Sequence, residues 1–345
     1  MVFFWMAVVL LSLLAYVILD GYDIGIGTLT LFERDAGTRR DMLDVVGNVW
    51  DGNESWLILL AMGLWAGFPD AYAAALPGLY LPVCLMLCAL IFRGFAIEMA
   101  LHRPGFDRVW GRLFGVGSLV TAFAQGVVFG GLLSGITVVD HRFAGRPWDF
   151  LGHGYALLTG CAAVLLYTWA GAAQLQAKLD VDKRRRATRQ VRLLTGPVVL
   201  ASVLSACLLP IASNGRLRLD GVDRWLPFGY GLLIAIGAFY AAWRWAGRSP
   251  KQVSFFAAVA AQIGGMLALV CLYFPQLVPP SVTIYSAAAG RNTLVFLTVM
   301  IGIIGPGTVG YGIYAHWVFR SAPSAKPVTE TPRAADGRAA LSASR

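Results

Sequence analysis

Charged residues are scarce in this chain. They make up 14% of its 345 residues, while hydrophobic residues make up 57%. Soluble domains usually carry about 25% charged and about 45–50% apolar residues, so the composition excludes an ordinary soluble domain. The apolar residues form long continuous runs and do not alternate with polar ones, which disfavours a transmembrane β-barrel. The composition therefore predicts an all-α integral membrane protein, crossing a lipid bilayer several times.

Histidines are few, and none lies in the middle of an apolar run. The four are His102, His141, His153 and His316. A haem buried in a helix bundle is usually held by a histidine, or a histidine and a methionine, from within the helices. The placement predicts that this chain ligates no haem, with His102 or His141 at a membrane edge left as the alternative.

Cysteines are also few, and all of them fall within apolar runs. The five are Cys84, Cys88, Cys161, Cys207 and Cys271. Free cysteine packs as a small apolar residue, and we expect that role here. Cys84 and Cys88 lie one helical turn apart, but two cysteines without further ligands do not make a metal site. No metal site is predicted.

Nine segments are long and apolar enough to cross a bilayer, which takes about 20 residues. They cover residues 3–31, 52–68, 76–99, 113–137, 153–177, 193–213, 226–246, 253–274 and 291–319. The first has no basic leader, so we expect a spanning helix there and no cleaved signal. We expect one transmembrane domain over residues 1–320, grouped as two four-helix bundles plus one peripheral helix. Residues 321–345, rich in Ala, Ser, Pro, Thr and Arg, predict a disordered tail.

Arginine and lysine are unevenly divided among the connections between these segments. The odd-numbered connections and the tail carry 21 of the 28 basic residues, and the even-numbered connections carry 5. Cytoplasmic loops are enriched in basic residues, so the pattern predicts an N-terminus outside and a C-terminus in the cytoplasm. The same pattern accounts for the net charge of +9. Nucleic-acid binding is disfavoured, because no basic patch is interleaved with exposed aromatic residues.

Several acids lie within or at the ends of the first three expected spans. They are Asp20, Asp23, Asp51, Glu54 and Glu98. The first four form two pairs at i, i+3, a spacing that places both members on one helix face. A charged side chain at the bilayer centre costs about 2.5–3.5 kcal/mol or more, and such residues usually mark an ion or proton pathway. All five are predicted to lie in the cytoplasmic half, where they are candidates for a proton path.

Polar neighbours of these acids are candidates for ion-pair or structural roles. They are Arg93, Trp50, Asn53 and Gln125. Each acid also has a simpler interpretation. Asp51 could cap the second helix, Asp23 could pair with Arg93 for stability alone, and Glu54 and Glu98 could be solvated at the membrane surface. From the residues alone, the acids leave two kinds of function open: a proton or polar pathway, as in a proton-coupled secondary transporter, and a purely structural subunit.

The motifs that hold these acids carry a family resemblance. LDGYDIGIG and VWDGNESWL are followed by FPDAYAAALPGLYLP and LIFRGFAIE, then by QGVVFGGLLSG and FPQLVPPS. In this order and at this spacing, they resemble subunit II of cytochrome bd-type quinol oxidases. The resemblance covers residues 2–320, and the two acidic motifs are its most specific part.

The resemblance implies a heterodimer in the bacterial cytoplasmic membrane, with small accessory subunits as further candidates. Such an enzyme oxidises quinol and reduces dioxygen to water with protons from the cytoplasm. Subunit I carries the haems b and d and the quinol-oxidation site. Subunit II has nine spans, ligates no haem, stabilises subunit I and contributes acids to a proton route. In some members it holds a structural quinone.

The resemblance also implies roles for individual residues. Asp23 and Asp51 match the family's buried acids, and Arg93 matches the arginine of the third helix. Trp50, Gly52 and Asn53 match the neighbours of these acids. Many members have glutamine after the Gly-Asn pair, where this chain has Glu54. The extra carboxylate changes the charge of the expected site.

Overall fold

The computed structural model of the chain describes residues 1–102, 107–139, 142–151, 154–213, 222–248, 250 and 252–319. The expected tail over 321–345, and both His141 and His153, lie outside these residues. Residues Met1–Val295 form one compact unit and Phe296 begins a second. Each unit is described by itself, and helix α11 runs from the first into the second.

The described part of the chain is almost entirely helical, as the composition predicts. Its helices are α1 (Val2–Thr30), α2 (Ala36–Gly47), α3 (Trp50–Met62), α4 (Pro69–Gly78), α5 (Tyr80–His102), α6 (Asp107–Ser134), α7 (Tyr155–Lys178), α8 (Val181–Ala212), α9 (Val222–Trp245), α10 (Val253–Tyr273) and α11 (Arg291–Phe319). A π-helical turn η1 (Gly63–Gly67) continues α3, and a 3-10 turn η2 (Asp149–Leu151) precedes α7. Two short antiparallel hairpins pair β1 (Val138–Val139) with β2 (Arg142–Phe143) and β3 (Gln276–Val278) with β4 (Val282–Thr283).

Seven helices of the described residues are long and apolar enough to cross a membrane: α1 and α5 to α10. An eighth span results if α3, η1 and α4 are counted together as one bent segment. The ninth expected span coincides with α11, whose apolar part, Arg291–Gly307, is shorter. Several spans are therefore present, while the number nine and the grouping into bundles stay predictions.

The structure corrects three expected boundaries. Residues 69–75, expected to be a loop, belong to helix α4, which is bent by 117° from the preceding helix. The bend falls at Phe68, whose φ of −135° and ψ of 62° are not helical. The residue before a proline is pushed away from helical geometry, and Pro69 then suits the first turn of a new helix.

The other two corrections concern segments rich in basic residues, at the start of α8 and in the first connection. Helix α8 was expected to begin near residue 193 but begins at Val181, because lysine and arginine favour helices and extend a span beyond the bilayer. The first connection contains the unexpected helix α2, which is capped by the Asp35 carboxylate accepting a 2.7 Å hydrogen bond from the Thr38 amide.

Helix α1 packs against α3, α6 and α7, and α7 packs in turn against α8 and α10. Every residue of α1 from Asp20 to Thr30 is buried. Glycines make this position possible. A Cβ at Gly25 would lie 1.8 Å from the Tyr167 carbonyl oxygen of α7, and one at Gly27 would lie 2.1 Å from Ser118 Oγ of α6. The glycines of the first acidic motif therefore let three helices pack closely around it.

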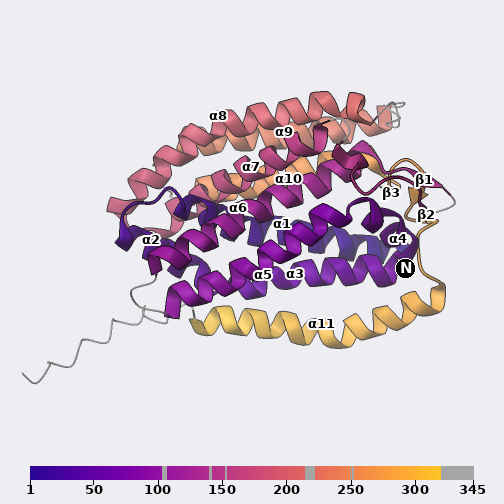
Figure 1. The fold of residues 1–345 in the computed structure, drawn as a ribbon, viewed down its shortest axis with the longest axis horizontal. Coiled ribbons are helices and arrows are strands. Elements are labelled where there is room, and N and C mark those ends of the chain that lie inside the picture. Colours follow the sequence, from indigo (N-terminus) through magenta and orange to yellow (C-terminus); the bar gives the residue numbers. More distant parts are fainter. Residues whose placement is uncertain are drawn as a thin grey trace, which may run out of the picture. The chain divides into compact units, whose positions relative to one another are not determined.

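The connections rich in basic residues meet at one end of the first unit, the end with α2 in Figure 1. Arg40 donates hydrogen bonds of 3.0 Å to the carbonyls of Ala100 and Leu101 at the end of α5. Arg192 of α8 donates a 2.7 Å bond to the Ala246 carbonyl, just after α9. Arginines near helix C-termini satisfy carbonyls that lack a partner within the helix. The N-terminus and both hairpins lie at the opposite end (Figure 1).

Ion pairs join α8 to the segment around α2 at the same end. Lys183 pairs with Asp41, and Arg186 pairs with Glu33. Burial raises the pKa of Glu33, but the hydrogen bond from Arg186 and the 2.9 Å bond from the Asp35 amide lower it by more, so the pKa lies below its ordinary value. The carboxylate of Glu33 is therefore stabilised in its charged form by the folded chain.

Candidate functional site

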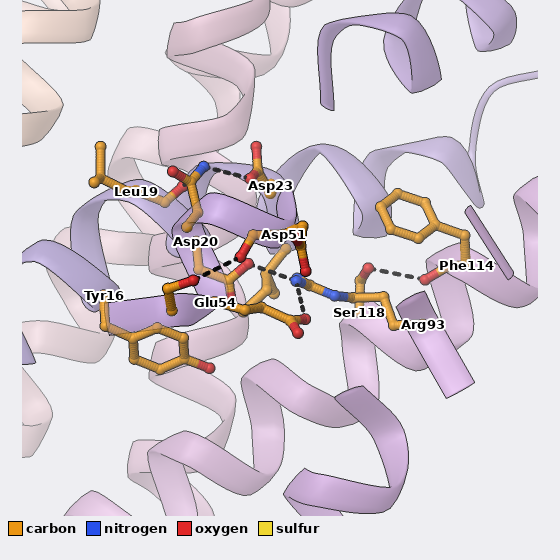
Figure 2. A network of polar contacts seen from close by, with 12 residues as sticks. Tyr16, Leu19, Asp20, Asp23, Asp51, Glu54, Arg93, Phe114 and Ser118 are labelled. Carbon is orange, nitrogen blue, oxygen red and sulfur yellow. Dashed lines mark hydrogen bonds and ion pairs between the residues drawn. The ribbon is translucent and has the colours of Figure 1, made fainter. Parts of the chain in front are cut away.

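One arginine gathers two of the predicted acids inside the helix array. Arg93 of α5 lies 2.5 Å from Asp20 of α1 and 2.7 Å from Glu54 of α3, with both contacts made by Nη2 (Figure 2). The side chains of Arg93 and Asp20 are 1% and 0% exposed, and that of Glu54 is 24% exposed. We expected Arg93 to pair with one acid; it pairs with two. Helices α1, α3 and α5 each supply one charged member.

A second contact ties α3 to α1 one turn further along. Asn53 Nδ2 donates a 2.7 Å hydrogen bond to Asp23 Oδ2, and Asp23 is fully buried. Trp50 lies over Gly94 of α5, where an added Cβ would come within 3.0 Å of the indole ring. The motif around Trp50 and Asn53 therefore fits the acids of α1 on one side and α5 on the other.

Polar atoms remain buried at this site without a hydrogen-bond partner among the described residues. They are Asp20 Oδ2, Asp23 Oδ1, Arg93 Nε, Arg93 Nη1 and Gln125 Oε1. Buried polar groups are rarely left unpaired in native proteins, and internal water usually satisfies them. The donors and acceptors on α1, α5 and α6 are therefore suited to hold water between the side chains.

Tyr16 also belongs to this neighbourhood and was not among the predicted site residues. Gln125 Nε2 of α6 donates a hydrogen bond to the Tyr16 hydroxyl, and Tyr16 is 3% exposed. Tyr16 precedes Asp20 by four residues, so both lie on one face of α1. That spacing was the available signal. We name Tyr16, Asp20, Asp23, Asn53, Glu54, Arg93 and Gln125 the polar cluster.

Two of the predicted acids lie outside the polar cluster. Asp51, matched by the resemblance to a buried acid, is exposed on this chain in the first turn of α3. The buried acid that accompanies Asp23 is Asp20. Glu98 lies in the last turns of α5, where it pairs at 3.3 Å with the largely exposed ring of His102.

No group of three or more histidine, cysteine or acidic side chains within the described ranges could hold a metal ion. His102, whose side chain is 72% exposed, donates a 3.0 Å hydrogen bond from Nδ1 to the Glu98 carbonyl at the end of α5. This position does not suit an axial ligand of a buried haem. The polar cluster consists of carboxylates, amides, one tyrosine hydroxyl and one guanidinium.

Comparison with known proteins decides the family. A sequence model of the family described as cytochrome bd terminal oxidase subunit II matches residues 1–319. The chain belongs to this family. Cytochrome bd ubiquinol oxidase subunit 2 of Bacillus subtilis (strain 168) is 26% identical over 337 residues, which cover 94% of this chain and 98% of the relative.

Two further relatives extend the comparison. Cytochrome bd-I ubiquinol oxidase subunit 2 of Escherichia coli (strain K12) is 34% identical over 209 residues, 58% of this subunit II chain and 55% of the relative. A chain of the bd oxidase structure from Geobacillus thermodenitrificans matches with a TM-score of 0.76 and 16% identity, over 93% of this chain and 99% of that one. At this identity the structural match supports the fold alone. It agrees with an all-helical, multi-pass membrane protein.

Proposed function

We propose that this subunit II chain works in a membrane complex that oxidises quinol and reduces dioxygen to water, and that its polar cluster carries protons for that reaction. Family membership supports the first part and favours it over a proton-coupled secondary transporter. The relatives from B. subtilis and E. coli are named as ubiquinol oxidase subunits.

The arrangement of charge supports the second part. The carboxylates of Asp20 and Glu54 contact the guanidinium of Arg93 directly, and the third carboxylate, Asp23, is buried three residues further along α1 and bound by Asn53. With all three ionised, the buried site would carry an excess of negative charge, which is costly away from water. A proton held among the carboxyls removes part of that cost, so the site is suited to take up and release one.

The unpaired polar atoms supply the means of transfer. Water bound to Asp20 Oδ2, Asp23 Oδ1 and the free Arg93 nitrogens would link the carboxyls within hydrogen-bonding reach. Glu54, the most exposed of the three acids, is the natural entry point. Glu54 lies in the second turn of α3, the helix that follows α2 along the chain, and the distribution of basic residues predicts the end with α2 to be cytoplasmic. The exposed Asp51 is a candidate for the outermost step.

Subunit I is the proposed partner and carries the haems b and d, which supply electron transfer and dioxygen reduction when bound. The ring of His102 is largely exposed and is not suited to be an axial ligand, and we predict that this chain ligates no haem. This chain stabilises subunit I and shelters the acids from lipid. A structural quinone and small accessory subunits stay predictions from the resemblance.

Replacing Asp20 with Asn in the purified complex tests the proton role. We expect retained subunits and haem absorbance, with oxygen uptake and proton uptake both reduced by at least tenfold. Glu98→Gln is the matched control, because Glu98 is an acid of the same region that lies outside the polar cluster, and we expect near-normal turnover. Full turnover in the Asp20 variant would remove the cluster from the mechanism, while loss of haem would indicate a role in assembly.

A further inference from the structure

Helix α8 is longer than a bilayer requires. Its 32 residues span about 48 Å at 1.5 Å per residue, whereas the hydrocarbon core is about 30 Å thick. The apolar residues 193–212 are sufficient to cross that core. The preceding turns, residues 181–192, therefore extend into the headgroup region and the water beyond it, at the end with α2.

The basic residues of these turns fall into two groups. Lys183 and Arg186 pair with acids near α2, and Arg184 donates a 3.2 Å hydrogen bond to the Leu179 carbonyl. Arg185 and Arg189 are exposed, and within the described residues no carboxylate lies within ion-pair distance of either. Asp180 and Asp182, the nearest acids in the chain, do not balance the six basic residues from 183 to 192.

Arg185 and Arg189 lie on the same face of α8 as a row of exposed residues further along the helix. Exposed positions recur along the helix at steps of three or four residues. They are Arg185, Arg189, Arg192, Gly196, Leu200, Val203, Cys207 and Ile211. Such positions share one helix face. Only 17% of the apolar window of α8 is buried, so this stripe presents apolar side chains to lipid tails along most of its length. The arginines continue the same stripe at headgroup level.

Helix α9 adds aromatic side chains at the same level. Arg192 binds the Ala246 carbonyl, which places the end of α9 beside the arginine stripe. Trp243 and Trp245 at that end are 50% and 44% exposed, and tryptophan favours the boundary between hydrocarbon and headgroups. Figure 1 shows α8 and α9 side by side along one edge of the first unit.

We propose that Arg185, Arg189 and Arg192 bind the phosphates of anionic lipids in the leaflet at the end with α2. The apolar stripe below the arginines argues for a lipid over a soluble acidic partner, because one molecule with acyl chains and a phosphate fits both parts of the surface. Basic residues near a membrane surface each strengthen the attraction to anionic lipid by about fivefold, and salt weakens it. This proposal does not depend on the proton role of the polar cluster.

Lipid selectivity of the purified complex tests the proposal. Spin-labelled phosphatidylglycerol and phosphatidylcholine would be compared by electron paramagnetic resonance in vesicles of phosphatidylcholine, at low and at high salt. At the strongest sites, we expect the Arg185→Gln/Arg189→Gln variant to lower the association constant of phosphatidylglycerol, relative to that of phosphatidylcholine, by up to about 25-fold. Arg192 is left in place in this variant because it also holds the end of α9.

Arg142→Gln/Arg146→Gln is the matched control, since it removes two exposed arginines from the hairpin end. We expect it to retain the selectivity of the parent. Arg→Gln at exposed helix positions changes helix propensity little, and equal thermal midpoints in phosphatidylcholine would show that both variants fold. Unchanged selectivity in the first variant would overturn the proposal. So would an equal loss in both variants, or loss of a bound acidic protein while lipid selectivity is retained.

Discussion

Removing the guanidinium of Arg93 gives the sharpest test of the polar cluster as a stabilising unit. Arg93→Gln leaves Asp20, which is fully buried, without its ionic partner, and removes a 2.7 Å contact to Glu54. Removing one member of a buried ion pair costs about 3–5 kcal/mol, because an uncompensated charge remains. Most of that cost falls on Asp20, since Glu54 is 24% exposed and can gain water. We therefore expect a loss of about 3–5 kcal/mol in the free energy of unfolding.

A double variant separates the ion pair from simple loss of packing. Arg93→Gln with Asp20→Asn removes both charges, so no buried charge is stranded at Asp20. We expect this double variant to be more stable than Arg93→Gln alone, with a coupling energy of about 0.5–3 kcal/mol. The measurement is reversible denaturant unfolding of the chain in mild detergent. Arg34→Gln is the control, because Arg34 is exposed, and we expect a change within about 0.5 kcal/mol.

Two results would refute this reasoning. The first is an Arg93→Gln variant as stable as the Arg34→Gln control, which would mean that Asp20 is already hydrated or neutral. The second is strict additivity of the two substitutions, which would mean that the 2.5 Å contact between Arg93 and Asp20 carries no net energy.

Two further predictions concern packing and pH. Gly25→Ala places a Cβ 1.8 Å from the backbone carbonyl oxygen of Tyr167, which cannot rotate away, so we expect destabilisation of about 3 kcal/mol or more. Gly237→Ala is the control, because a Cβ there would meet nothing within 4 Å, and we expect it to be neutral or stabilising. Equal thermal midpoints for the two variants would contradict the prediction. The pKa of Glu33 is lowered in the folded chain, mainly by Arg186 against the effect of burial, so its contribution is present above the unfolded pKa of about 4.3 and is lost as the pH falls through the lower folded value. Glu33→Gln should remove this pH-dependent part of the free energy of unfolding, which is at most about 1 kcal/mol because Arg186 is exposed. The measurement is a set of unfolding curves between about pH 3 and about pH 7. A variant that loses as much stability on acidification as the parent would refute the prediction.

Several features followed from local rules applied to the sequence. The presence of long membrane helices followed from the continuous apolar runs, because runs of about 20 apolar residues are typical of helices that span a bilayer. The meeting of the basic connections at one end followed from their alternation along the chain, since consecutive spans run in opposite directions. The polar cluster was foreseen in outline, because acids inside apolar helices need a partner and Arg93 was the nearest cation.

Other features required information that no single segment carries. The predicted start of α8 was wrong because hydropathy marks only the part of a helix that lies in the bilayer, and α8 continues beyond it into water. Helix α4 was missed because ten residues are too few to be recognised as a span, and the 117° bend before it depends on packing around Pro69. Tyr16 was missed because its partner, Gln125, is more than one hundred residues away in the sequence.

The sequence by itself determined that this protein is a multi-pass helical membrane protein with acids in its first three spans, because hydrophobicity and charge act residue by residue. Only the tertiary structure decided which acids share Arg93, why Asp51 and Glu98 stand apart, and why Gly25 must be glycine. Those outcomes depend on how closely α1 approaches α3, α5 and α7, and that distance is set by side chains from different parts of the chain packing against one another.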